Sequence, residues 1–174
     1  MTIKDQVVAQ AQTAKVASRK LAKLSPEQRS AALLAVANVL KTNISSIVEQ
    51  NKLDVAASTG KLSNALLDRL TLTESRISAM IQGVVDVASQ QDPLGEVLES
   101  RAGADGIFIK KVRTPIGVVG IIFESRPNVI VDAAAICFRA GNACILRGGK
   151  EAINSNRLLV SLIQQGLELA GVDP

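Results

Sequence analysis

The sequence predicts an α/β protein in which a helical N-terminal region and an exposed β-hairpin precede the start of a parallel sheet. Three observations predict this order. Apolar residues repeat at helical spacing over the first half of the chain, two short charged runs then flank an Asp-Gly turn, and two apolar runs near the C-terminus each lead into a helical pattern. Strand–helix–strand–helix order with short connections is typical of a right-handed βαβ unit.

The composition excludes several classes of protein. With 174 residues and 47% hydrophobic side chains, the chain can bury a core, which excludes a disordered or low-complexity segment. It has no His and only two Cys, so His-based metal sites, catalytic triads and a disulfide scaffold are excluded and a reducing, cytoplasmic compartment is expected. A net charge of +4, 2% aromatic residues and no long apolar stretch predict no nucleic-acid or membrane partner.

An amphipathic helix is predicted at the N-terminus. Its apolar stripe consists of Val7, Ala11, Ala14, Ala17 and Leu21. Basic residues of this segment also occur in transit peptides, but a surface helix is the simpler interpretation.

Further helices are predicted up to residue 93, where Asp92-Pro93 ends the pattern. Ser25 and Thr73 are good N-caps, and Gln28 completes a capping box with Ser25. A break is expected at Thr42-Asn43. Between the two caps, Gly60 is expected to end a helix and residues 64–70 to form a short one. Residues 1–93 are therefore predicted to be the helical part of the chain.

Residues 94–114 are predicted to form an exposed β-hairpin. The runs Glu96–Arg101 and Ile107–Arg113 are joined by a loop that contains Asp105-Gly106. Charged side chains in both runs indicate an arm rather than part of a core sheet.

Residues 115–174 are predicted to begin a parallel sheet. Ile116–Phe123 is apolar, β-branched and does not alternate, which predicts a strand buried on both faces. A helix over 128–139, a second strand over 143–146 and a last helix over 151–170 follow. Gly117 and Gly120 lie inside the first strand, where we expect them to let a helix pack close to the sheet.

The segments that follow the two strands are the candidates for chemistry. Arg147-Gly148-Gly149-Lys150 opens a helix at the carboxyl end of a strand, where open α/β sheets bind ligands and helix N-termini attract phosphate. An ordinary strand-to-helix turn is the alternative. After the first strand, Asn128 can either cap the helix or donate to an oxyanion, and Arg126 can pair with a carboxylate or phosphate.

Neither cysteine is expected to be a nucleophile. Cys137 falls in an Ala-rich helix and Cys144 in an apolar strand. Apolar surroundings raise the pKa of a thiol and leave it unreactive.

Three segments carry a specific resemblance: Val112–Asn128, Val131–Ala135 and Gly141–Gly149. On them the chain resembles the γ-glutamyl phosphate reductase family, a branch of the aldehyde dehydrogenase superfamily, and the resemblance extends over the whole chain. Glu-Ser-Arg-Pro-Asn and Leu-Arg-Gly-Gly are specific to this branch. Lys150 departs from the family pattern, in which a small residue such as Ser is expected.

The resemblance implies an aldehyde dehydrogenase-like fold and the NADPH-dependent reduction of L-glutamyl 5-phosphate to L-glutamate 5-semialdehyde in proline biosynthesis. In the family a cysteine of a later domain forms a thioacyl enzyme, which hydride from NADPH reduces. We therefore expect this chain to be the N-terminal portion of such an enzyme, with the catalytic domain absent and no activity alone. The alternative is a non-catalytic NADP-binding or oligomerisation module.

The resemblance also assigns roles to residues and partners. Asn128 matches the oxyanion-hole amide, Arg147 the residue that reaches the adenosine ribose or its 2′-phosphate, and Ser125 and Arg126 lie near the substrate. The remaining residues expected at the cofactor are Ile122, Phe123, Gly148, Gly149 and Lys150. No metal is expected. The arm, residues 94–114, is expected to form a homo-oligomer, and glutamate 5-kinase is a possible channelling partner.

Overall fold

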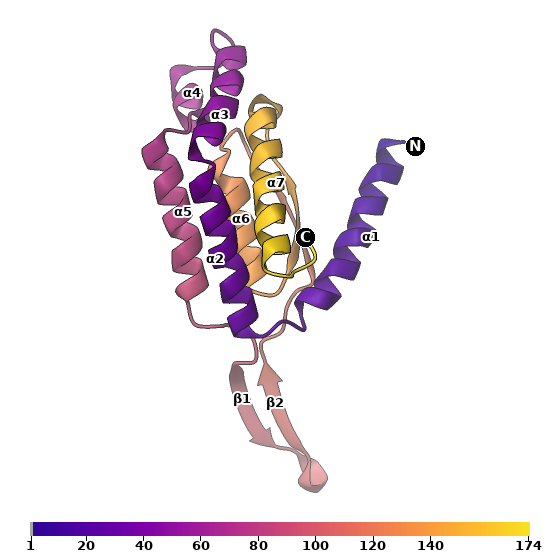
Figure 1. Ribbon diagram of the computed structural model, residues 1–174. Helices are drawn as coiled ribbons and strands as arrows, with labels where there is room; N and C mark the ends of the chain where they lie inside the picture. Colours follow the sequence, from indigo (N-terminus) through magenta and orange to yellow (C-terminus); the bar gives the residue numbers. More distant parts are fainter. Residues whose placement is uncertain (1) are drawn as a thin grey trace.

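The computed structural model describes residues 2–174, in which helices predominate (Figure 1). The helices are α1 (Ile3–Leu21), α2 (Pro26–Thr42), α3 (Ile44–Ser58), α4 (Asn64–Leu70), α5 (Glu74–Ser89), α6 (Asn128–Arg139) and α7 (Ile153–Leu169). The strands are β1 (Val97–Ala102), β2 (Phe108–Val112), β3 (Val118–Ile122) and β4 (Ala143–Arg147). Short 3₁₀ turns lie at Ala104–Gly106 and Lys150–Ala152. The predicted α/β class and the order of its elements are confirmed.

One hydrophobic core joins helices from both halves of the chain. Helix α2 packs between α5 and α7, with α6 behind it (Figure 1). Four large apolar side chains, one each from α2, α3, α5 and α7, are 0% exposed: Leu40, Ile47, Ile77 and Leu159. Burial of each contributes roughly 1.5–3 kcal/mol. The N-terminal helices therefore share their core with the helices that flank the sheet.

The capping residues mark the helix ends as predicted. Ser25 Oγ accepts a hydrogen bond from Gln28 N at 3.2 Å, and Gln28 Oε1 accepts one from Ser25 N at 2.8 Å. Thr73 Oγ1 caps α5, α2 and α3 meet at Asn43, and Gly60 follows α3 with a φ of +78°. These local signals were sufficient because each depends on residues within four positions.

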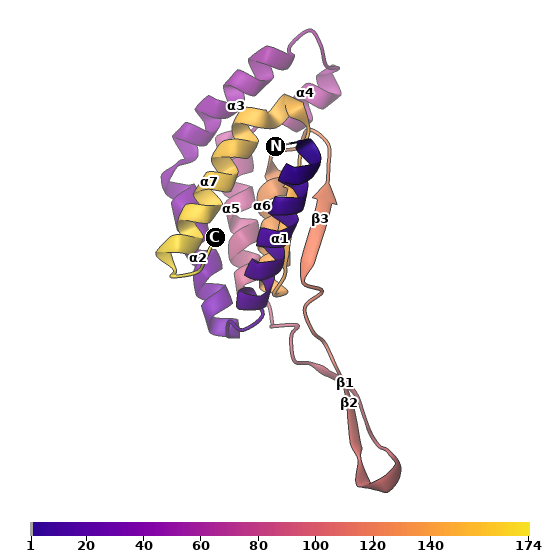
Figure 2. The same cartoon turned by 90° about the vertical axis from the view of Figure 1, so that its right-hand side faces the viewer.

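The arm is also confirmed. Strands β1 and β2 pair antiparallel with Arg101 opposite Ile109, and every residue of both strands is exposed. Asp105 and Gly106 adopt positive φ angles of 56° and 79° at the turn. The arm projects from the helical body (Figures 1 and 2).

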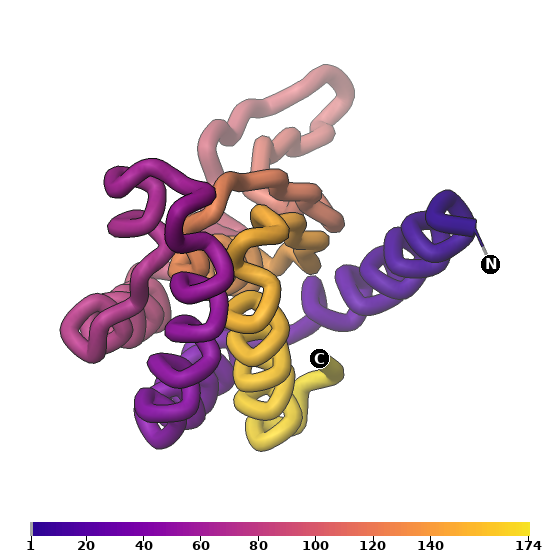
Figure 3. The backbone as a smooth tube through the Cα atoms, turned by 90° about the horizontal axis from the view of Figure 1, so that it is seen from above, coloured from indigo at the N-terminus to yellow at the C-terminus, as the bar shows by residue number. Residues whose placement is uncertain are grey.

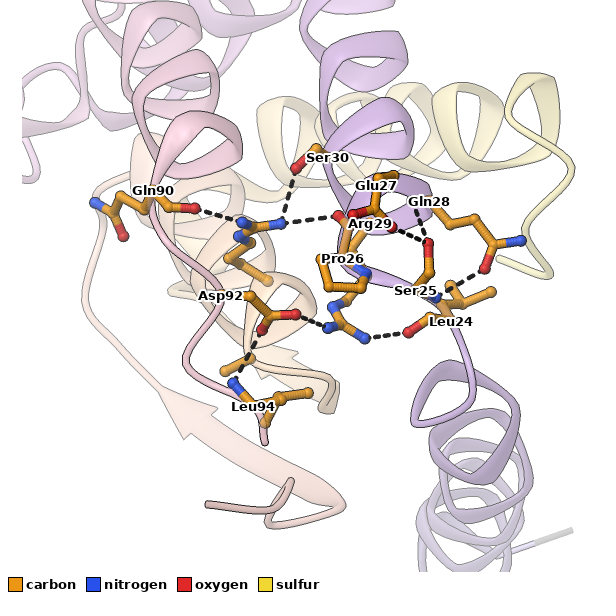
Figure 4. A network of polar contacts seen from close by, with 12 residues as sticks. Leu24, Ser25, Pro26, Glu27, Gln28, Arg29, Ser30, Gln90, Asp92 and Leu94 are labelled. Atoms are coloured by element: carbon orange, nitrogen blue, oxygen red, sulfur yellow. Dashed lines mark hydrogen bonds and ion pairs between the residues drawn. The ribbon is translucent and has the colours of Figure 1, made fainter. Parts of the chain in front are cut away.

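Two buried arginines anchor the arm at its root (Figure 4). Arg29 pairs with Asp92, whose second carboxylate oxygen accepts a hydrogen bond from Leu94 N at 3.0 Å. Arg139 donates to oxygen atoms of three residues at the ends of α2 and α5: Pro26, Ser30 and Gln90. The root of the arm is thus tied to three helices at once.

Strands β3 and β4 form a parallel pair, with Gly120 opposite Ile145. The expectation that β3 is buried on both faces is wrong, since Ile116 and Ile122 are 83% and 80% exposed. The physical reason is that, apart from its pairing with β4, the strand is contacted mainly by α1 within residues 2–174, so parts of its faces lie uncovered.

The expected role of the strand glycines is also wrong. A methyl group on Gly117 or Gly120 would meet no atom within 4 Å, so no helix packs against them. Close packing occurs instead at Gly166 of α7, where a methyl group would lie 2.5 Å from Val36 Cα of α2.

Helix α1 stands apart from the other helices and lies beside the sheet (Figures 1 and 3). Of its predicted stripe only Leu21 is buried, and Val7 is 55% exposed. Ala14, Ala17 and Leu21 line a cleft of about 740 Å³ between α1, α6, β4 and α7. No single helix among the described residues is long and apolar enough to cross a membrane. Helices α2 and α3 taken together have the length and composition of a membrane span, but they are bent by 70° relative to each other.

Candidate functional site

The loops that follow β3 and β4 meet at the carboxyl end of the strand pair, at the end of the molecule opposite the arm (Figure 2). Phe123 N donates to Arg147 O at 3.0 Å, and Ser125 Oγ donates to Glu151 Oε2 at 3.0 Å. Hydrogen bonds from its own backbone N–H and from Ser125 lower the pKa of the Glu151 carboxyl. Ser125, expected near the substrate, therefore bridges to the segment after β4, and Glu151 is a residue that the sequence did not indicate.

The turn after β4 packs closely against the other loop at its two glycines. A methyl group on Gly148 would lie 2.5 Å from Asn156 Nδ2 and 3.0 Å from the Phe123 ring. One on Gly149 would lie 2.6 Å from Glu151 Oε2 and 2.8 Å from Ser125 Oγ. The turn is thus packed from both sides, and a larger residue at either position would require these side chains to move.

Helix α7 is already capped by an anion of this chain. Asp54 is 2% exposed, and its carboxylate accepts hydrogen bonds from the backbone N–H groups of Asn154 at 3.1 Å and Ser155 at 2.8 Å. Ser155 Oγ adds a bond of 2.6 Å. The expectation that the start of this helix attracts phosphate is therefore not met, and the helix itself begins only at Ile153.

Asn128 does not cap α6. The helix has no side-chain cap, and Asn128 Nδ2 donates instead to Asp132 Oδ2 at 3.0 Å. Partial burial raises the pKa of the Asp132 carboxyl, and the hydrogen bond from Asn128 lowers it in part. Of the two uses that the sequence left open, the capping role is wrong and the donor role stays a prediction.

Three cations lie exposed at this end of the strands: Arg126, Arg147 and Lys150. None of them forms an ion pair with the residues described. Glu124, two residues before Arg126, pairs with Arg69 of α4, with 3.8 Å between Glu124 Oε2 and Arg69 Nη1. The edge therefore presents free positive charge beside the glycine turn, a composition suited to an anionic ligand.

Both thiols lie away from this edge and are unreactive by their surroundings. Burial, together with the neighbouring Cys137, raises the pKa of the Cys144 thiol to about 12. Burial also raises the pKa of the Cys137 thiol, which a hydrogen bond with Cys144 partly offsets. Neither forms a thiolate near neutral pH, which agrees with the prediction that neither is a nucleophile.

This predicts the thiol chemistry of the folded chain. At about pH 8, a disulfide reagent such as DTNB is expected to react slowly with both thiols in the native chain and rapidly after unfolding in guanidinium. The denatured sample is the control, because it counts the two thiols present. Rapid modification of Cys137 or Cys144 in the native chain would contradict the inert assignment.

The large cleft is a separate feature. None of the nine residues that the sequence assigned to catalysis, substrate or cofactor lines the cleft beside α1. The candidate site is therefore the edge formed by the two loops.

The chain matches the model of the aldehyde dehydrogenase family over residues 2–172. The chain belongs to this family. Within it, a γ-glutamyl phosphate reductase of Carboxydothermus hydrogenoformans is 54% identical over 164 residues, which cover 94% of this chain and 40% of the relative. This aldehyde dehydrogenase-family chain thus spans about 40% of the length of that relative, in keeping with the N-terminal portion that the resemblance implies.

Two solved structures share the fold of this aldehyde dehydrogenase-family chain. The γ-glutamyl phosphate reductase of Thermotoga maritima is 35% identical, with a TM-score of 0.91 over 95% of this chain and 40% of its own. That of Saccharomyces cerevisiae is 36% identical, with a TM-score of 0.91 over 99% of this chain and 44% of its own. The aldehyde dehydrogenase-like fold and the resemblance to the reductase branch are confirmed.

Proposed function

We propose that this chain forms part of an NADPH-dependent γ-glutamyl phosphate reductase, which reduces L-glutamyl 5-phosphate to L-glutamate 5-semialdehyde. The observation that carries the proposal is the likeness, over nearly the whole chain, to relatives that bear this name. Residues 1–93 and 115–174 would belong to the cofactor-binding domain, and residues 94–114 to an arm between subunits. The chain alone is expected to be inactive.

The edge formed by the two loops fits a dinucleotide. The turn Gly148–Gly149 lies at the carboxyl end of β4, where open α/β sheets bind ligands, and the exposed Arg147 and Lys150 flank it. Arg147 and Lys150 would hold the adenosine ribose or its 2′-phosphate, while Ile122 and Phe123 would line the cleft. When bound, NADPH would supply hydride to the carbonyl carbon of the substrate.

The loop after β3 would serve the substrate. Asn128 would donate its amide N–H to the carbonyl oxygen as negative charge develops there, when a thiolate adds to the carbonyl and phosphate leaves. Arg126, exposed beside it, would pair with the phosphate or a carboxylate of the substrate. Because the pKa values of both thiols of this chain are raised, the thiolate would come from outside these 174 residues.

The arm and the supply of substrate complete the proposal. Apolar side chains of the arm, among them Ile107 and Phe108, are 62% and 64% exposed, which supports burial between subunits of a homo-oligomer. A kinase that phosphorylates the γ-carboxylate of glutamate must supply the acyl phosphate, and channelling from it would limit hydrolysis.

The test is a chimera in which residues of this chain replace the matching segment of the Carboxydothermus hydrogenoformans relative. It is expected to form NADPH from the semialdehyde, phosphate and NADP⁺, the reaction in reverse. Asn128→Ala should lower kcat roughly 10²- to 10³-fold with KM little changed. Asn38→Ala, at an exposed asparagine of α2, is the matched control. A folded chimera without activity would refute the proposal.

A non-catalytic NADP-binding or assembly module is the second candidate, favoured by the exposed arm and the free cations. Titration of the 174-residue chain with NADPH, combined with sedimentation, separates the two. Saturable binding and a defined oligomer, together with an inactive chimera, would favour the module.

A further inference from the structure

We propose that Asp132 is a positioning residue that fixes the direction of the Asn128 carboxamide. The inference rests on the proposed function, in which Asn128 donates to the substrate oxygen. It starts from the pairing of the two side chains one turn apart on α6, where Asn128 Nδ2 lies 3.0 Å from Asp132 Oδ2.

A carboxamide can present either its nitrogen or its oxygen, and only the nitrogen can donate to an oxyanion. An ionised carboxylate accepts and cannot donate, so it attracts the NH₂ group of Asn128 and repels Oδ1. Without this partner, an asparagine at the start of a helix commonly turns its oxygen toward backbone N–H groups. Asp132 therefore selects the orientation that an oxyanion donor needs.

The pairing leaves one N–H free. The amide nitrogen has two hydrogens, and no second acceptor for Asn128 Nδ2 exists within the described residues. Asp132 itself is half-buried on α6 and faces Gly83 of α5: a methyl group on Gly83 would lie 4.0 Å from Asp132 Oδ1, an ordinary contact. The half-buried carboxylate therefore holds one hydrogen of the Asn128 amide and leaves the other for a ligand.

The first experiment uses the 174-residue chain itself and does not require enzymatic activity. The side-chain NH₂ signals of Asn128 are compared by NMR in the unsubstituted chain, in Asp132→Asn, which keeps an acceptor, and in Asp132→Leu, which removes it. Two well-separated proton signals are expected in the first two, and signals like those of a solvent-exposed amide in the third. Equal spectra in all three would overturn the proposal, and matched circular dichroism verifies that each variant folds.

The second experiment measures catalysis in the chimera. Asp132→Leu is expected to lower kcat about 10- to 100-fold with KM unchanged, less than the loss from removing Asn128, because the donor is present but misdirected. Asp132→Asn should restore most of the activity. The Asn128→Ala/Asp132→Leu double variant should be no slower than Asn128→Ala alone.

The outcomes separate this inference from the proposed function. If Asn128→Ala leaves kcat unchanged, Asn128 is not the oxyanion donor, and Asp132 then has no role in positioning one. The positioning role alone is overturned if Asn128→Ala slows the chimera but Asp132→Leu does not. It is also overturned if the loss of kcat in the double variant equals the product of the two single losses.

Discussion

Asp54→Ala is expected to lower the free energy of unfolding by about 3 kcal/mol. The substitution leaves the first N–H groups of α7 and the hydroxyl of Ser155 without an acceptor inside the core, and each unsatisfied buried group costs roughly 1–3 kcal/mol. Loss of a helix cap alone costs ~1 kcal/mol. Since a domain of this size is stable by only about 5–15 kcal/mol, the effect is large. Urea unfolding followed by circular dichroism measures it.

Two variants serve as controls for Asp54. Asp54→Asn keeps an acceptor and should fall between the alanine variant and the original chain. Asp86→Ala, at an exposed position of α5, should change the free energy of unfolding by no more than about 0.5 kcal/mol. If Asp54→Ala is as stable as Asp86→Ala, the carboxylate does not hold α7 as described.

Gly166→Ala is expected to destabilise the fold by roughly 3 kcal/mol, the upper part of the range for overpacking. The added methyl group would lie 2.5 Å from Val36 Cα and 2.8 Å from Val36 N, so the backbones of α2 and α7 must move apart. Helix propensity alone predicts the opposite, since alanine is favoured over glycine in a helix by about 1 kcal/mol.

Gly83→Ala is the matched comparison in α5. There the nearest atom to a new methyl group is Asp132 Oδ1 at 4.0 Å, an ordinary contact. This variant should therefore gain about 0.5–1 kcal/mol, also measured by urea unfolding. A shift of the same sign at both glycines would contradict the close approach of α2 and α7.

The features that the sequence predicted well depend on neighbours in the chain. Ser25, Thr73 and Gly60 mark helix ends through contacts within a few residues, and Asp105-Gly106 marks the turn of the arm in the same way. The two loops of the candidate site were also predictable, because the carboxyl ends of parallel strands lie at one edge.

The features that were missed depend on contacts between distant segments. Asp54 reaches Ser155 across 101 positions, and nothing around Asp54 in sequence indicates a helix to be capped. Nothing in the sequence around Gly166 distinguishes it from other helical glycines, because its close contact is with Val36 of α2. The apolar run of β3 shows only that the strand is suited to burial, not that its neighbours are present. The pairing of Asp132 with Asn128 was predictable from the sequence, since a spacing of four residues places both side chains on one helix face.

The crystal structure of the chimera with NADPH bound tests the central claim most directly. That claim is that the loops after β3 and β4 hold the cofactor of a reductase. The adenosine ribose is expected to lie against the Gly148–Gly149 turn, with Arg147 within hydrogen-bond distance of the ribose or its 2′-phosphate. NADPH bound elsewhere, for example in the cleft beside α1, with both loops left in solvent, would contradict the claim.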